Sequence, residues 1–376
     1  MREDVIAKLA GAMKEAGLDA IVACSPENFA YVTGFLSPTQ PLMRWRHAMA
    51  LVTADAAIAL AVVDMEASTI RAKVGEGGAP AEIAVWREFA FDAMPVLADL
   101  LKRHGLAAAR IGIDTDYLPA ADFAELLRLM PGAQFVPAQG LLSRLRSCKT
   151  PAEIDILRRL SRIADRAIAG AYAAVAAGAT EMDIAAALTR GVYEGGAEYF
   201  KLMIVATGER SVFPNVGPTA RVLKRSDICR VEIFPMSGGY HAGVCRTAAV
   251  GAPPPQAERI WANLTACKYM LLDAIRPGAS SRAIYDLYLA KTAELNLPRI
   301  SFIGHGIGLH LHEDPYLGPG ADQTLEAGIV LGIEPLIYET GFGFGMQNKD
   351  MVLVTVHGCE LMSDCTNTDQ LILVAG

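Results

Sequence analysis

The sequence predicts two domains, an α/β domain followed by an α+β domain that contains an internal pseudo-two-fold repeat. Three observations support this. The chain has 376 residues, which is long for one domain. Residues 1–140 alternate amphipathic helices with short apolar strands. Residues 150–376 contain two similar segments that lie 100 positions apart.

The first domain shows the alternation of an α/β fold. Apolar residues at helical spacing predict helices over residues 4–16, 93–103 and 120–130. Short apolar and β-branched runs predict buried strands over residues 19–24, 48–53, 58–63 and 111–113. The segment carries neither a phosphate loop nor a dinucleotide-binding fingerprint.

A strong helix start opens the second domain. Thr150 is the expected N-cap, Pro151 occupies the first turn, and Glu153 completes a capping box. We expect this helix to run to about residue 176, and a second helix to start at Thr180. Residues 138–150 are then the junction between the domains.

Two sets of matched residues define the repeat. Gly178-Ala179-Thr180 and Gly278-Ala279-Ser280 match at an offset of 100, and each lies between a long and a shorter predicted helix. Each is followed by an apolar run that predicts a strand, over residues 202–206 and 300–303. Two such copies predict a layered domain with its site between the halves.

A glutamate lies near the end of a strand-like segment in each copy, over residues 227–234 and 328–335. Leu223 lies nine residues before Glu232, and Leu325 lies nine residues before Glu334. Because the copies are related by pseudo-symmetry, we expect the two glutamates to face the same site.

Composition excludes several classes of protein. Hydrophobic residues make up 52% of the chain and charged residues 20%, so a large core is expected. The net charge is −7 with no long basic run, which argues against nucleic acid as a partner. The longest apolar stretch, residues 167–179, is too short to cross a membrane. Seven scattered cysteines, and an N-terminus without the apolar core of a signal peptide, predict a cytoplasmic protein.

Three of the seven histidines lie in the stretch Gly304–Pro315. His305 stands between glycines, and His310 and His312 follow within eight residues. In a strand, alternation would put His310 and His312 on one face. Such a cluster favours acid–base chemistry or metal binding.

Several segments match one known family in order and spacing. They are Asn28–Gly34, Gly239-Tyr240-His241, Arg246-Thr247, Gly304–Gly308, His312-Glu313, Glu334-Pro335 and Asp350–Thr355. On these residues the C-terminal half resembles the pita-bread family, which includes creatinase, prolidase, aminopeptidase P and methionine aminopeptidase. The N-terminal half is similar to the smaller domain of the creatinase and prolidase branch. The resemblance implies a creatinase-type N-terminal domain over residues 1–140 and a pita-bread catalytic domain over residues 150–376.

The peptidases of this family bind two metal ions with two aspartates, one histidine and two glutamates. By resemblance, these positions hold Glu232, Gly243, His305, Glu334 and Lys349 here. Gly243 offers no ligand and Lys349 is a cation, so we expect no dinuclear metal centre and no cofactor. A single metal on Glu232, His305 and Glu334 stays open as an alternative.

One stretch resembles creatinase, the metal-free branch of the family. It is Phe234-Pro235-Met236 followed by Gly239-Tyr240. However, Asn215 and Cys245 replace creatinase's catalytic histidine and its guanidinium-binding glutamate, which argues against creatine itself. Val231-Glu232-Ile233 looks more like the ectoine hydrolase branch.

The resemblance therefore predicts an enzyme that hydrolyses a non-peptide C–N bond without metal. The bond would belong to an amidine, cyclic amidine or guanidino group of a small amphoteric metabolite. The first alternative is a metal-dependent Xaa-Pro dipeptidase or aminopeptidase. The second is a non-catalytic pita-bread binding protein.

Hydrolysis without metal needs a base or nucleophile and a proton donor for the leaving nitrogen. We expect Glu232 and Glu334 to supply the base or nucleophile, because two glutamates near one cation can titrate apart. We expect His305 and His312 to move protons.

Substrate contacts are expected from both domains. Lys349 and Arg46 could anchor a substrate carboxylate, since arginine presents a planar fork of donors. Trp45, Asn215 and His241 complete the predicted binding set. In creatinase an aromatic side chain and an arginine from the partner subunit complete the site, and the resemblance therefore implies a homodimer in which Trp45 and Arg46 do so here.

Overall fold

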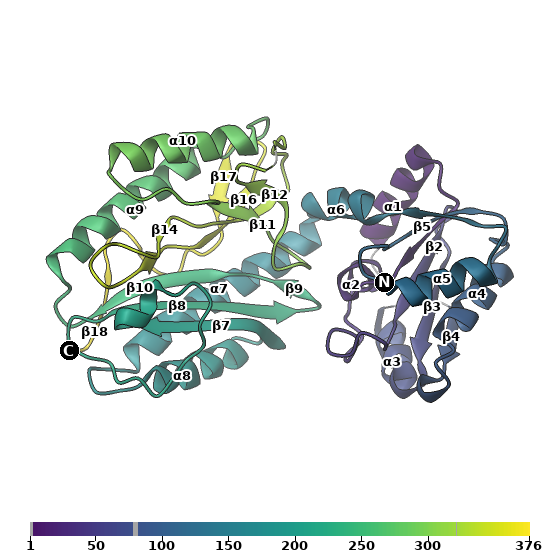
Figure 1. Cartoon of the computed structure of the whole chain (residues 1–376), viewed down its shortest axis with the longest axis horizontal. Coiled ribbons are helices and arrows are strands. Elements are labelled where there is room, and N and C mark those ends of the chain that lie inside the picture. The colour runs from purple at the N-terminus through teal and green to yellow at the C-terminus, as the bar shows by residue number, and fades with distance from the viewer. Residues whose placement is uncertain (1–2, 78–81, 321) are drawn as a thin grey trace. The chain divides into compact units, whose positions relative to one another are not determined.

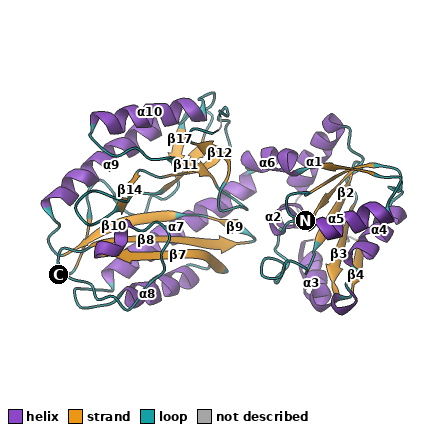
Figure 2. Cartoon of the chain, viewed as in Figure 1, coloured by secondary structure: helices purple, strands orange, loops and turns teal. Residues whose placement is uncertain are grey.

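The structure is a computed structural model of the whole chain, and it describes residues 3–77, 82–320 and 322–376. The chain divides into two compact units between Arg146 and Ser147 (Figure 1). The first unit combines helices with one mixed sheet, and the second combines long helices with mainly antiparallel sheets (Figure 2). The predicted fold class, an α/β domain followed by an α+β domain, is confirmed.

A single sheet forms the centre of the first unit. Its strands are β1 (Ala20–Ala23), β2 (Met49–Thr53), β3 (Ile58–Val63), β4 (Glu82–Trp86), β5 (Arg110–Ile113) and β6 (Gln134–Pro137), in the spatial order β4-β3-β2-β1-β5-β6. β1, β5 and β6 are parallel, whereas β2 runs antiparallel to both β1 and β3. The four predicted strands agree with β1, β2, β3 and β5 to within one residue at each end.

Helices accompany this sheet. They are α1 (Glu3–Ala16), α2 (Pro26–Thr33), α3 (Ala67–Gly77), α4 (Ala93–Arg103), α5 (Ala120–Leu129) and α6 (Gln139–Ser147). Leu97 of α4 and Leu126 of α5 are fully buried in one apolar core with Val22 and Ile113 of the sheet. The helices predicted from apolar spacing are α1, α4 and α5, and all three are confirmed.

The start of α7 (Pro151–Ala173) opens the second unit as predicted. The Thr150 side chain accepts a hydrogen bond from the backbone N–H of Glu153, and the Glu153 carboxylate accepts one from the N–H of Thr150 at 2.8 Å. Thr180 and Asp183 form the same capping box for α8 (Glu181–Glu194). Both predicted helix starts are confirmed, and α7 ends slightly earlier than expected.

Matching hydrogen bonds show the internal repeat. The N–H of Gly178 donates to the carbonyl of Leu223 at 2.9 Å, and the N–H of Gly278 donates to the carbonyl of Leu325 at 2.8 Å. Each copy supplies a long helix and a shorter one, and the second pair is α9 (Pro255–Ala274) and α10 (Ser281–Glu294). The same chemistry at an offset of about 100 residues therefore gives the same local fold twice.

The strands of the second unit form two larger sheets and one small one. The strands of the first sheet are β7 (Tyr199–Thr207), β8 (Ile228–Ser237), β9 (Tyr240–His241), β10 (Val244–Val250) and β18 (Ile372–Val374). The strands of the second are β11 (Gly304–Gly306), β12 (Glu313–Leu317), β13 (Val330–Ile333), β16 (Asp350–Val354) and β17 (Cys359–Leu361). β14 (Leu336–Ile337) pairs with β15 (Met346–Gln347). The Tyr172 hydroxyl fixes α7 to the first sheet by donating to the carbonyls of Cys229 and Arg246 at 2.9 and 2.8 Å.

Two expectations about the second copy are wrong. The strand predicted over residues 300–303 lies at Gly304–Gly306 instead, because the partner strands β12 and β13 pair with those residues. The segment from His310 to His312 is not a strand. The N–H of Gly308 donates to the carbonyl of His310 at 3.1 Å, and this tight turn breaks the alternation that the sequence suggested.

Within the described part of the chain, no helix is both long enough and apolar enough to cross a membrane.

Candidate active site

A backbone bridge between the two sheets positions Lys349. Cys245 and Lys349 exchange two backbone hydrogen bonds, each 3.2 Å long. Cys245 lies opposite Glu232 in the pairing of β10 with β8. The first copy of the repeat therefore brings Glu232, and the second brings Lys349, to the same point in the fold.

The Lys349 ammonium lies between the two glutamates. Its Nζ is 2.8 Å from Oε1 of Glu334 and 3.1 Å from Oε1 of Glu232. Burial alone would lower the pKa of Lys349, but the two carboxylates outweigh burial and raise it above its usual value. The side chain is 2% exposed and stays charged. The two glutamates that the repeat relates therefore share one cation.

Glu334 is an ionised carboxylate in this cluster. Burial would raise the pKa of its carboxyl, but Lys349 and His305 reverse that effect and hold the pKa well below its usual range. Its second oxygen, Oε2, accepts a hydrogen bond from the Gln347 side chain at 3.1 Å. Arg230 in turn donates to Oε1 of Gln347 at 3.1 Å. The carboxylate is thus held on both of its oxygens.

His305 connects this cluster to the surface. Its Nε2 is 3.0 Å from Oε1 of Glu334, and its Nδ1 is 2.7 Å from the carbonyl of Gly306. The ring of His312 stacks on it, with ring centroids 3.6 Å apart and an angle of 14° between the planes. His305 is fully buried, whereas His312 is exposed.

The pKa of His312 lies below its usual value, at about 4. Loss of solvent on its inner side is the main cause, and the neighbouring His305 and Lys349 add to it. His312 is therefore neutral at pH 7 and can accept a proton. It is the exposed member of the predicted catalytic set.

Phe234 and Gly243 complete the surroundings of the ammonium. Lys349 Nζ lies 4.6 Å from the centroid of the Phe234 ring, a distance typical of a cation–π contact. A Cβ on Gly243 would come within 2.3 Å of the Phe234 ring and 3.2 Å of Cε of Lys349. The position where the family carries its second aspartate is thus filled by an aromatic ring.

Sequence reasoning missed three members of the cluster, Arg230, Phe234 as a ring over the cation, and Gln347. Strand alternation could have found two of them. Arg230 lies two residues before Glu232 in β8, and Phe234 lies two residues after it. Residues at that spacing point to the same face of a strand. Gln347 had no such signal, because β15 ends at that residue and Lys349 lies outside it.

The other predicted binding residues differ in their burial and in their partners. His241 is buried, its Nδ1 lies 3.0 Å from the carbonyl of Gly308, and burial lowers its pKa to about 4. Asn215 is exposed in the segment between β7 and β8. In the first unit, Arg46 pairs with Glu88 through two contacts of 2.6 and 2.9 Å, and Trp45 donates to the same carboxylate at 3.3 Å. The predicted role of Trp45 and Arg46 in a partner's site stays a prediction, as do the homodimer and the cytoplasmic location.

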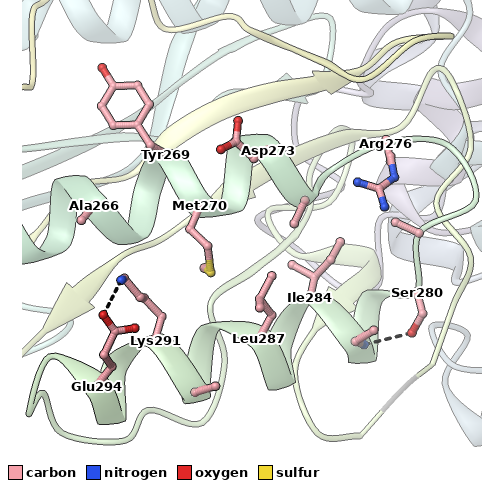
Figure 3. A pocket seen from close by; sticks show the side chains of 14 residues that line it. Ala266, Tyr269, Met270, Asp273, Arg276, Ser280, Ile284, Leu287, Lys291 and Glu294 are labelled. Atoms are coloured by element: carbon pink, nitrogen blue, oxygen red, sulfur yellow. Dashed lines mark hydrogen bonds and ion pairs between the residues drawn. The ribbon is translucent and has the colours of Figure 1, made fainter.

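A separate hollow lies between α9 and α10 (Figure 3). Met270 of α9 and Ile284 and Leu287 of α10 project into it. Lys291 pairs with Glu294 at its rim, 2.9 Å apart. The hollow shares no residue with the Lys349 cluster and brings together no set of groups suited to acid–base chemistry.

Comparison with known families identifies the class of protein. Residues 155–356 match metallopeptidase family M24, and residues 6–148 match the creatinase/prolidase N-terminal domain. The first match covers more than half of the chain, and the chain belongs to family M24. The resemblance to the creatinase and prolidase family is thereby confirmed.

Particular relatives are named as dipeptidases. The probable dipeptidase PepE of Mycobacterium tuberculosis is 32% identical over 283 residues, which are 72% of this chain and 74% of the relative. The Xaa-Pro dipeptidase of Pyrococcus furiosus is 27% identical over 243 residues, 64% of this chain and 69% of the relative. Dipeptidase PepE from Mycobacterium ulcerans has a solved structure with a TM-score of 0.83 and 26% identity, covering 99% of this chain and 98% of that one.

The expectation of a non-peptide C–N hydrolase is wrong, because these relatives are dipeptidases and the peptidase alternative fits them better. The residues that suggested creatinase have structural roles. The ring of Phe234 covers Lys349, and the Tyr240 hydroxyl donates to Glu153 at 2.8 Å. The placement nearest the creatinase branch is not supported.

The name of the family implies metal, but the residues here do not fit a metal centre. Gly243 supplies no donor atom, and the Lys349 ammonium lies about 3 Å from the oxygens that a metal would need. Among the residues that the structure describes, no three His, Cys, Asp or Glu side chains are arranged to hold an ion. No catalytic step through a metal follows from this site.

Proposed function

We propose that this chain hydrolyses short peptides, with dipeptides as the first class to test. One observation carries the proposal. An exposed imidazole, His312, is neutral at pH 7 and stacks on His305 of the buried ion cluster. The relatives named as dipeptidases support the substrate class.

The proposed chemistry uses His312 as the group that moves the proton. His312 takes a proton from a water molecule while the water oxygen attacks the peptide carbonyl carbon. The carbonyl oxygen becomes negatively charged in the tetrahedral intermediate. His312 then returns the proton to the peptide nitrogen as the C–N bond breaks, which releases an amine and a carboxylic acid. Because the pKa of His312 is low, its protonated form gives the proton up readily.

The buried groups act by charge and by position. His305 holds the ring of His312 by stacking at 3.6 Å, and Glu334 holds His305 at 3.0 Å. Lys349 adds a fixed positive charge beneath the site, in surroundings where water does not screen it strongly. That charge favours the developing oxyanion and the carboxylate of a dipeptide.

A dipeptide panel tests this proposal. Purified protein is incubated with Xaa-Pro and non-proline dipeptides, with chelator in one series and added Mn²⁺ in another. We expect cleavage of at least one class, a loss of at least about 100-fold in kcat for His312→Asn, and wild-type rates for the neighbouring control His310→Asn. The value of kcat/KM should be flat above pH 5 and fall as the pH drops through about 4, where His312 gains a proton.

Two results would overturn the proposal. One is the absence of cleavage across the panel in both series. The other is a His312→Asn variant as active as the wild type.

A non-catalytic binding protein is the second candidate, and one observation favours it. The charged and polar groups of the cluster contact one another and are at most 4% exposed; they belong to Glu232, His305, Glu334 and Lys349. Saturable dipeptide binding in calorimetry, without turnover in either series, would support this candidate over the first.

A further inference from the structure

We propose that Lys349, Phe234 and Gly243 form one interlocked unit that supplies a built-in cation where the family places metal, so that the natural protein takes up no divalent ion there. The proposal concerns metal binding and is independent of the peptide-hydrolysis proposal.

The ammonium occupies the space between the two carboxylates. A lysine ammonium has three N–H donors. Nζ of Lys349 donates to Glu334 at 2.8 Å and to Glu232 at 3.1 Å, and Nε2 of His305 lies 3.4 Å away. These are the atoms that a metal would need, at the about 2.0–2.2 Å typical of metal–ligand bonds. The ammonium and a metal ion cannot occupy this space together.

The second ligand position is closed by packing. The ring of Phe234 covers Nζ at 4.6 Å, and it occupies the space that any side chain at position 243 would enter. Even the Cβ of an alanine would lie 2.3 Å from the ring. Glycine at 243 is therefore what admits the ring over the lysine.

A second glycine supports the same arrangement. A Cβ on Gly332 would lie 3.1 Å from Cε of Lys349 and 3.7 Å from Cε1 of His305. Gly332 thus leaves room for the lysine stem beside His305. A site that had merely lost its ligands would have no reason to fit the stem, the ring and the ammonium so closely.

The balance of charge also argues against a divalent ion at this site. The two glutamates carry two negative charges. Lys349 contacts both carboxylates, and Arg230 reaches Glu334 through Gln347. These two cations already balance the carboxylates, so a divalent ion would add two positive charges to a neutral, buried site. Repulsion from Lys349 at such short range is strong where water is excluded.

Metal binding by the full-length protein tests the proposal. Wild-type protein and the variants Lys349→Glu and Lys349→Met are stripped with chelator, checked for folding by circular dichroism, and titrated with Mn²⁺ and Zn²⁺ in a calorimeter. We expect no saturable binding by the wild type and one ion per chain for Lys349→Glu, in which a carboxylate joins Glu232, His305 and Glu334. Lys349→Met, which removes the ammonium without adding a ligand, should bind at least tenfold more weakly than Lys349→Glu.

The close packing of Phe234 against Gly243 is tested separately by thermal unfolding. Gly243→Ala should lower the unfolding midpoint, and Phe234→Ala in the same chain should recover much of that loss, because the ring is what the new methyl group meets. Phe234→Ala alone is the matched control.

Three outcomes would overturn the proposal. They are saturable binding of about one or more ions per chain by the wild type, a folded Lys349→Glu variant that binds none, and additive losses from Gly243→Ala and Phe234→Ala. A dipeptidase that worked only with added Mn²⁺ would contradict this inference and leave the peptide-hydrolysis proposal standing.

Discussion

Two buried ion clusters centre on consecutive residues, Lys349 and Asp350, and their charges are arranged in opposite ways. Lys349 is one cation between two carboxylates. Asp350 is one carboxylate between two cations, Arg246 and Lys268, each 2.8 Å away. Strand alternation sends the two side chains to opposite faces, so the same backbone serves both clusters.

The clusters differ in what surrounds them. Arg246 pairs with Asp165 of α7 at 2.9 Å and also donates to the backbone carbonyls of Cys245 and Lys349. The Asp350 cluster therefore joins helix and sheets and is buried throughout. The Lys349 cluster continues through His305 to the exposed ring of His312. A buried ion cluster whose partners are all buried stabilises the fold. A cluster that reaches an exposed titratable ring can also take part in acid–base chemistry.

The largest expected loss of stability comes from a substitution in the Asp350 cluster. Arg246→Met should lower the free energy of unfolding by about 3–5 kcal/mol, because it leaves Asp165 and Asp350 buried with one cation fewer. Urea unfolding followed by circular dichroism measures the change. A loss below about 1 kcal/mol would show that this cluster does not stabilise the frame.

Lys349→Met should lower the free energy of unfolding by less, on the order of 3 kcal/mol at pH 8, because His305 remains beside Glu334. In the wild type the pKa of Glu334 is depressed, so its stabilising effect is present above the usual carboxyl pKa and is lost as the pH falls through the depressed value. In the variant, burial without the cation raises that pKa. The difference in unfolding free energy between the two proteins should therefore shrink from pH 8 to pH 5.

Urea midpoints at pH 8, 6.5 and 5 measure this, with Lys349→Arg as the variant that keeps the charge. A difference that stays constant across this range would mean that the lysine stabilises by packing and not by pairing.

The smallest expected effect is that of Lys268→Met, a loss of about 1–2 kcal/mol. Asp350 keeps Arg246 and the Ser363 hydroxyl, which donates to it at 2.7 Å. Differential scanning calorimetry beside Arg246→Met gives the ranking. Equal losses for the two variants would show that Asp350, and not the wider network of Arg246, dominates this cluster.

Local features of the fold were predictable from sequence. The capping boxes at Thr150 and Thr180 need only residues three apart, and both are present in the structure. The repeat was visible because a Gly-Ala-Ser/Thr start forms the same hydrogen bonds in both copies. The strand predicted over residues 300–303 failed because its position depends on β12 and β13, which lie further along the chain.

The candidate site was predictable in its members but not in its contacts. Residue identity alone showed that Gly243 offers no ligand and that Lys349 is a cation, and the resemblance predicted that Glu232, Glu334 and His305 belong to the same site. The fold in space was needed to show that the ring of Phe234 fills the space beside Gly243, that Lys349 contacts both glutamates, and that His312 stacks on His305. Those contacts join residues more than a hundred positions apart in some cases, and close packing between sheets sets them, which no local pattern records.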